Sequence, residues 1–198
     1  MSAQQRPALS FDRETHVYSL GDRVLPSVTE ILRGAGIVDD RWWTAAGAWR
    51  GSAVHLACWY DDQNDLDESQ LDPALRGYVD AYRKFKSDTS FTPTDIETPL
   101  YNDLLGYAGT PDRIGKLQDK RLCLPDLKSG ASSKVTRYQT VAYVACLPSP
   151  RKYVRMEVRL QPNGKYFLQV YEPKDFEGDF RKWQSIVDVF HLRREIGL

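Results

Sequence analysis

The stretch LPDLKSG, Leu124–Gly130, places an acid and a base two residues apart in a short β-prone segment. Because successive side chains of a strand point to opposite faces, Asp126 and Lys128 share one face while Leu127 points to the core. Taken alone, such a pair is also typical of a solvated ion pair on an edge strand. Its meaning therefore depends on which other residues the fold brings to the same face.

A second acid lies in the β-prone segment that precedes this one. In GTPDRIG, Gly109–Gly115, Asp112 is followed by an apolar Ile114 and a glycine. Two neighbouring strands that each carry an acid can bring Asp112, Asp126 and Lys128 to one end of a sheet. Two carboxylates held together repel each other unless a cation lies between them, and oxygen ligands suit Mg²⁺ or Mn²⁺. A lysine beside such a metal can orient a water molecule or stabilise charge on a phosphate.

The periodicity of the rest of the chain predicts helices first and then strands with helices between them. Ser27 and Glu30 have the spacing of a capping box, and Asn163-Gly164 is the strongest hairpin signal. This order favours an α/β (α+β) fold with a mixed central β-sheet flanked by helices. The predicted elements are hairpins at His16–Leu25 and Lys152–Glu172, helices at Ser27–Gly36, Thr44–Asp61, Pro73–Asp88, Lys134–Leu147 and Pro173–Leu198, and a three-strand meander from Thr94–Asn102, Leu104–Leu117 and Lys120–Gly130.

Composition limits the class of protein. The chain has 198 residues, of which 41% are hydrophobic and 12% aromatic, so it can bury the core of one medium domain. Its formal net charge is zero, so any contact with nucleic acid must come from local placement of charge. The N-terminus lacks the form of a signal peptide, and no apolar run is long enough to span a membrane. We therefore expect a soluble cytoplasmic protein with no membrane partner.

Several motifs resemble, in the same order, those of the PD-(D/E)XK nuclease superfamily, and within it the RecB-like and phage-type exonuclease branch. The resemblance implies a restriction-endonuclease-like fold. It predicts one domain over 1–198, with an N-terminal hairpin and helix in 1–43, a catalytic core in 44–172 and a C-terminal helix in 173–198. The matching pieces are LPSVTEIL at Leu25–Leu32, RGSAVH at Arg50–His55, GTPDRIG at Gly109–Gly115, PDLKSG at Pro125–Gly130 and QTVAY at Gln139–Tyr143.

The resemblance also implies roles for individual residues. Asp112 and Asp126 would be carboxylate ligands of Mg²⁺ or Mn²⁺, and the backbone carbonyl of Leu127 another ligand. His55 would reach the same metal from its helix. Lys128 would position and activate the attacking water, which makes Asp112, Asp126 and Lys128 the expected catalytic residues.

Further residues are expected at the edge of this site. Gln139 and Tyr143 are four residues apart on a helix, so they lie on one face, where they would line the phosphate path; a structural hydrogen-bonded pair is the alternative. Glu97 matches an acid that could bind a second metal, or it is a surface residue. Arg50 is a candidate phosphate clamp. It lies five residues before His55, however, and therefore somewhat off the helix face that carries His55.

The function implied by the resemblance is a divalent-metal-dependent DNA exonuclease of phage or prophage recombination or repair. Its partners would be DNA, as a duplex end or a single strand, a single-strand annealing or other recombination protein, and further copies of this chain. The cell would be bacterial or phage-infected. A structure-specific or restriction-type endonuclease and a non-catalytic DNA-binding or scaffolding subunit are the alternatives.

Other features carry weaker expectations. Only three cysteines are present, Cys58, Cys123 and Cys146, so we expect no iron–sulfur cluster of the kind that some relatives hold. Trp42, Trp43 and Trp49 could stack on bases, but such residues more often pack in a core or against a helix. The acidic run Asp61–Glu68 is typical of a solvated loop away from the substrate.

Overall fold

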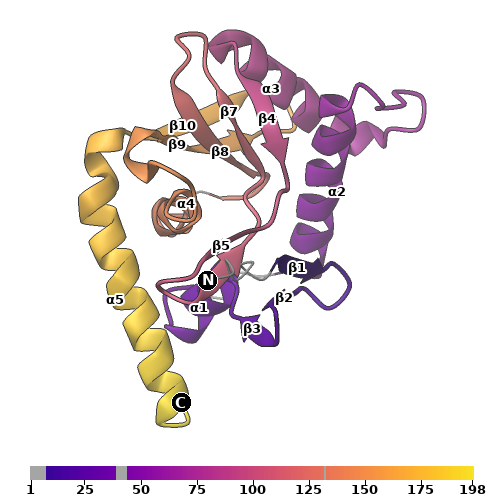
Figure 1. Ribbon diagram of the computed structural model, residues 1–198. Helices are drawn as coiled ribbons and strands as arrows, with labels where there is room; N and C mark the ends of the chain where they lie inside the picture. Colours follow the sequence, from indigo (N-terminus) through magenta and orange to yellow (C-terminus); the bar gives the residue numbers. More distant parts are fainter. Residues whose placement is uncertain (1–7, 39–43, 132) are drawn as a thin grey trace.

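The central element is a mixed five-stranded β-sheet with helices on both faces (Figure 1). The computed structural model describes residues 8–38, 44–131 and 133–198. The strand order is β10-β9-β8-β7-β4; β8 and β9 are parallel, and the other neighbours are antiparallel. The strands are β4 (Thr92–Ile96), β7 (Arg113–Lys116), β8 (Leu122–Lys128), β9 (Val154–Leu160) and β10 (Tyr166–Tyr171).

Two helical layers enclose this sheet. The first layer packs on one face through a core that includes Val54, Phe85 and Leu127. The second packs on the opposite face around Leu124 and the fully buried Trp183. The first layer consists of α2 (Ala45–Asp62) and α3 (Pro73–Thr89), and the second of α1 (Val28–Gly34), α4 (Thr136–Val144) and α5 (Phe176–Glu195). No helix of the described residues is long and apolar enough to cross a bilayer.

Smaller elements attach near the lower end of the sheet in Figure 1. The N-terminal segment forms a separate antiparallel three-stranded sheet, and a two-stranded ribbon is inserted between β4 and β7. These elements are β1 (Leu9–Asp12), β2 (Val17–Leu20) and β3 (Arg23–Leu25), and the ribbon strands β5 (Leu100–Asn102) and β6 (Tyr107–Gly109). Two 3₁₀ turns, η2 (Pro150–Lys152) and η3 (Pro173–Asp175), lie elsewhere, by the start of α5.

Local chemistry explains where the helices begin. The Ser27 side chain accepts from the Glu30 N–H, and the Glu30 carboxylate accepts from the Ser27 N–H, so the predicted capping box is confirmed. Thr44 caps α2, and Pro73 occupies the first turn of α3. Along α3 an apolar stripe at helical spacing, formed by Leu75, Val79, Tyr82 and Phe85, is buried against the sheet.

The predicted three-strand meander is interrupted. Its first two β-prone segments each break into two strands, and the inner halves pair with each other as the β5–β6 ribbon instead of joining the central sheet. Strand β1 was not predicted, and α4 is shorter than the expected helix. Trp42 and Trp43 lie outside the described residues, while Trp49 is 61% exposed on α2.

Strands β7 and β8 are paired over a short distance only. Their ladder consists of Gly115 with Cys123 and Lys116 with Leu122. Beyond Cys123, β8 continues beside β9 through to Lys128. The two strands therefore part on the side where Asp112 and Asp126 lie, and this parting creates the position of the candidate site.

Two helical glycines should respond in opposite directions to alanine. A Cβ on Gly77 of α3 would lie 1.8 Å from the Pro162 carbonyl oxygen, whereas a Cβ on Gly178 of α5 would meet nothing within 4 Å. We expect Gly77→Ala to lower the free energy of unfolding by about 1–3 kcal/mol. Gly178→Ala should raise it by about 0.5–1 kcal/mol because it removes backbone freedom from the unfolded chain. Urea unfolding of both variants measures this, and equal effects would contradict the packing of α3 on the β9–β10 turn.

Candidate active site

The carboxylate of Asp112 bridges the gap between the parted strands. Its Oδ2 accepts the N–H of Leu127 on β8 at 2.6 Å, and its Oδ1 lies 3.3 Å from Nδ1 of His55 on α2. Nε2 of His55 lies 3.0 Å from the Leu127 carbonyl oxygen. Since both nitrogens face acceptors, a doubly protonated imidazolium satisfies both contacts. His55, Asp112 and Leu127 are thus in direct contact with one another, and their expected role as ligands of one metal stays a prediction.

A second chain of contacts starts at Asp126 in the middle of β8. Its Oδ2 is 2.6 Å from Nζ of Lys128, which also donates to Oε1 of Gln139 at 3.1 Å. Nε2 of Gln139 in turn donates to the Tyr143 hydroxyl at 3.1 Å. The shared faces predicted for Asp126 with Lys128 and for Gln139 with Tyr143 are therefore confirmed. As expected, the Leu127 side chain is fully buried in the core.

The two acids have different electrostatic environments. Burial raises the pKa of Asp126 to about 6, helped by the charge of Asp112 and opposed by Lys128. Burial also acts to raise the pKa of Asp112, but His55 outweighs it and lowers that pKa to about 2. Although burial lowers the pKa of His55, the charge of Asp112 raises it above its ordinary value. A lower-pKa and a higher-pKa carboxyl side by side are typical of a functional site.

The remaining expected residues take different positions. Glu97 follows β4 with a φ of 48°, and its N–H donates to the Asp112 carbonyl at 3.1 Å, so it lies next to the site. A non-glycine residue in this left-handed region costs free energy, and such residues cluster at functional sites. Arg50 lies one turn into α2, half-buried, and its Nε has no hydrogen-bond partner among the described residues. It does not line the pocket described next, so its role as a clamp stays a prediction.

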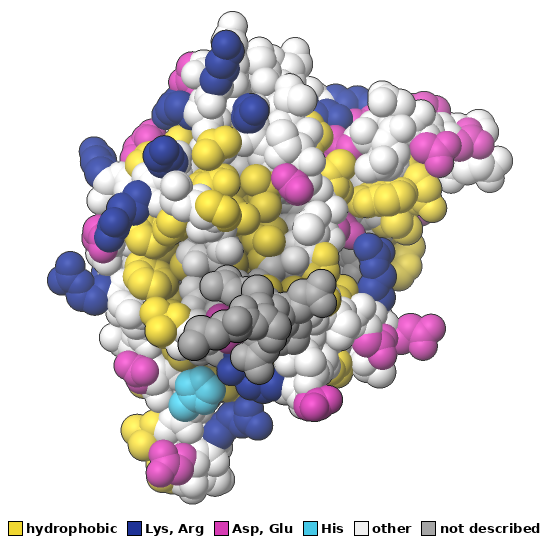
Figure 2. All heavy atoms as spheres, viewed as in Figure 1, with side chains coloured by type: hydrophobic (Ala, Val, Ile, Leu, Met, Phe, Trp, Pro, Cys, Tyr) yellow, Lys and Arg dark blue, Asp and Glu magenta, His cyan; other side chains and the backbone are white. Residues whose placement is uncertain are grey.

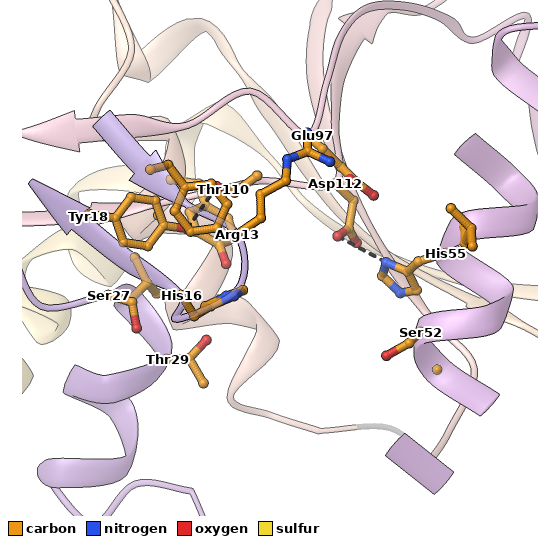
Figure 3. A pocket seen from close by; sticks show the side chains of 16 residues that line it. Arg13, His16, Tyr18, Ser27, Thr29, Ser52, His55, Glu97, Thr110 and Asp112 are labelled. Carbon is orange, nitrogen blue, oxygen red and sulfur yellow. Dashed lines mark hydrogen bonds and ion pairs between the residues drawn. The ribbon is translucent and has the colours of Figure 1, made fainter. Parts of the chain in front are cut away.

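A pocket of about 540 Å³ opens beside Asp112 (Figure 3). On one side it is bounded by Ser52, His55 and Leu56 of α2, with Glu97 and Asp112 next to them. The other wall comes from the N-terminal hairpin and the start of α1. This volume lies in the range of small-ligand sites, about 300–1,000 Å³. Asp126 does not line the pocket; it is 1% exposed, behind the pocket-lining residues.

The donor types fit a divalent cation. Two carboxylates and a carbonyl are the oxygen ligands that Mg²⁺ and Mn²⁺ prefer, and a histidine adds an imidazole. Among the described residues, however, no three His, Cys, Asp or Glu side chains are grouped so that they could hold a metal as they stand. Cationic side chains contact these oxygens instead: His55 faces Asp112 and Leu127, and Lys128 pairs with Asp126. The ligand set therefore stays a prediction that requires these pairs to separate.

Two residues that hold Asp112 were missed by the sequence analysis. Arg113 is fully buried; its Nη1 donates to the Asp112 carbonyl and its Nε to Asp62 Oδ2, both at 2.6 Å. Asp62 also accepts from the Tyr82 hydroxyl at 2.8 Å and from Lys86 at 2.9 Å. The prediction that Asp61–Glu68 is wholly a solvated loop is wrong at its start, because Asp62 ends α2 and is buried among these partners.

Glu157 is another missed residue. It lies beside Asp126 in the parallel register of β8 and β9, is 1% exposed, and pairs with Arg159 at 3.2 Å. Together with Asp126 and Asp112 it raises the pKa of Lys128 against the lowering effect of burial. The alternation of RMEVRL, which puts Glu157 and Arg159 on one face of a predicted strand, is the signal that could have found it.

Comparison with known proteins gives little further guidance. No protein-family model matches the chain, and no curated protein is similar to it. Among solved structures, the chain is similar to an alkaline exonuclease (LHK-Exo) from Laribacter hongkongensis. The TM-score is 0.28 and the sequence identity 15%, over 84% of this chain and 92% of that one. A likeness of this extent assigns no activity, so the function is argued from the site.

We expect Asp126→Asn to stabilise the metal-free protein at neutral and alkaline pH. Between pH 3.8 and about 6, folded Asp126 keeps a proton that the unfolded chain has lost, so the free energy of unfolding falls as the pH rises through that interval. The neutral amide avoids this loss. The gain should be on the order of 1–3 kcal/mol above pH 6 and vanish below about pH 4. Thermal unfolding in EDTA across this range tests it; a variant less stable at pH 8 would contradict a net cost of charging Asp126 at this buried position.

Proposed function

We propose that this chain is a divalent-metal-dependent deoxyribonuclease of the PD-(D/E)XK type, acting as an exonuclease in recombination or repair of phage or prophage DNA. The observation that carries the proposal is the convergence of Asp112, Asp126, Lys128 and His55 at one sheet end. These residues come from three segments of the sequence, namely α2, the segment leading into β7, and β8, and the contacts join them in two adjacent chains. A surface ion pair on an edge strand would need none of this convergence.

The metal site would be formed by oxygens of Asp112, Asp126 and Leu127 together with His55. A bound Mg²⁺ or Mn²⁺ supplies positive charge to the phosphate being cleaved and lowers the pKa of a water molecule. Glu97 could add a further carboxylate, since it lies beside Asp112 and lines the same pocket.

The residues of the chain have separate tasks in hydrolysis. The Lys128 ammonium, held by Asp126 and Gln139, orients the attacking water and balances charge that builds on the phosphate. The water oxygen bonds to phosphorus and loses a proton, the bond between phosphorus and the 3′ oxygen breaks, and that oxygen takes up a proton, which leaves a 5′-phosphate and a 3′-hydroxyl. Gln139 accepts a hydrogen bond from Lys128 and donates one to the Tyr143 hydroxyl, so this pair holds the Lys128 ammonium in place.

Because the net charge is zero, contact with DNA would depend on where individual charged side chains lie. Figure 2 shows Lys and Arg side chains on the α5 side and at the top of the sheet with Asp and Glu side chains among them, and further acids at the α2–α3 connection on the right. The acids of that connection include the exposed Asp65, Asp67 and Glu68.

Cleavage of end-labelled linear duplex and single strands tests the site. With Mg²⁺ or Mn²⁺ we expect wild-type activity, and EDTA should abolish it. Asp126→Ala and Lys128→Ala should each lower the rate by a factor on the order of 10² or more, since each removes a group that acts on the reacting atoms. Leu104→Ala, at a 91% exposed position, is the matched control and should be fully active.

Equal activity of wild type, Asp126→Ala and Lys128→Ala would overturn the site assignment. Inactivity of the folded wild type on every DNA and RNA would favour the scaffolding alternative, although the presence of Asp112, Asp126 and Lys128 together argues against a chain that has lost catalysis.

Closed circular DNA separates an exonuclease from an endonuclease with the same site. An exonuclease needs a free end, so we expect linear duplex to be degraded and a covalently closed circle of the same sequence to stay intact. Gel electrophoresis of both substrates over the same time course measures this. Linearisation of the circle would show that the chain is an endonuclease, and it would not contradict the assignment of the site residues.

A further inference from the structure

The wall of the pocket opposite the acids is formed by the β1–β2 hairpin, whose residues have no part in the chemistry above. Phe11, Arg13 and His16 of this hairpin line the same pocket as His55 and Asp112 (Figure 3). Phe11 is half-buried, and Arg13 and His16 are exposed. The pocket therefore has an acidic wall that faces an aromatic and cationic one.

The aromatic wall is rigidly backed. The Phe11 ring stacks on Tyr18 with centroids 4.4 Å apart and an interplanar angle of 18°, and His16 meets the edge of Phe11 at 5.2 Å. Tyr18 is 2% exposed, and its hydroxyl is 2.8 Å from Oγ1 of Thr110, two residues before Asp112. This contact ties the hairpin to the segment that carries the acid.

The Asp12 side chain braces the loop of the hairpin. Oδ1 of Asp12 accepts from the N–H groups of Glu14 at 2.9 Å and Thr15 at 3.2 Å. Arg13 makes no hydrogen bond or ion pair with any residue that the structure describes. In Figure 3 its side chain extends across the pocket toward Glu97. A guanidinium in this position is ready to contact an anion.

We propose that the hairpin binds the unpaired terminal nucleotide of the DNA, with its base against Phe11 and His16 and its phosphate within reach of Arg13. This rests on the nuclease function proposed above and deepens it, because it selects the substrate form. Aromatic side chains stack on bases whatever the sequence, and guanidinium binds phosphate oxygens. A base inside the duplex has both faces covered and a paired terminal base has one face covered, whereas an unpaired terminal base can leave the stack and turn a free face to this wall.

Two single-stranded oligonucleotides of the same sequence test the proposal. One ends in a normal nucleotide and the other in an abasic nucleotide. All proteins carry Asp126→Asn with Mg²⁺ present, so that the DNA is not consumed, and the affinity for each end is measured by fluorescence anisotropy. We expect the Asp126→Asn protein with native Phe11 to bind the normal end about 5- to 100-fold more tightly than the abasic end. Phe11→Leu keeps an apolar side chain but removes the ring, so it should bring the ratio of the two affinities close to one.

Two controls make the ratio interpretable. Phe11→Tyr retains the ring and should keep the full ratio, and Val24→Ala changes a 65% exposed residue of the same small sheet outside the pocket and should also keep it. Because each protein is compared with itself on two ligands, partial loss of folded protein does not change the ratio.

The proposal is overturned if the Asp126→Asn protein with native Phe11 binds both oligonucleotides equally or binds neither. It is also overturned if Phe11→Leu keeps the full ratio. Failure of the proposed function is a different result: no cleavage by the chain with its native Asp126. A chain that cleaves DNA but shows no base dependence refutes the hairpin site alone, and a base dependence without cleavage refutes catalysis alone.

Discussion

The parting of β7 from β8 is the constraint on which the rest of the site depends. Past Cys123 the backbone of β8 has β9 on one side only, and the N–H of Leu127 needs an acceptor on the other. Asp112 supplies it with a side chain instead of a carbonyl, at 2.6 Å. The requirement to satisfy the Leu127 N–H thus places a carboxylate beside β8, where a strand ladder would have placed a backbone carbonyl.

Holding Asp112 there requires buried charge behind it. Arg113 and Asp62 are both fully buried, and an ion pair of this kind is not by itself a source of stability, because desolvation offsets most of its attraction. The pair is better understood as a positioning device, since Arg113 also donates to the Asp112 carbonyl and so links the end of α2 to the acid. His55, on the same helix, approaches Asp112 from the pocket side.

The N-terminal hairpin completes this arrangement from outside the central sheet. Its Tyr18–Thr110 contact joins it to the same segment that carries Asp112, so the acid and the aromatic wall are fixed by one short stretch of chain. The electrostatic split between Asp112 and Asp126 arises in this enclosed space, where burial, two cations and mutual repulsion act together. Each acid alone on a solvated strand would titrate ordinarily.

The sequence by itself determined the fold class, the starts of α1, α2 and α3, and the shared face of Asp126 and Lys128. These follow from local rules: capping at Ser27, the stripe of α3, the turn at Asn163-Gly164, and alternation that puts Asp126 and Lys128 on one face. Only the tertiary structure decided that Asp62 leaves the acidic run to pair with Arg113, that Glu157 lies beside Asp126, and that the β1–β2 hairpin faces the acids. Such contacts join residues far apart in the chain, and no local periodicity encodes which distant surface a side chain will meet.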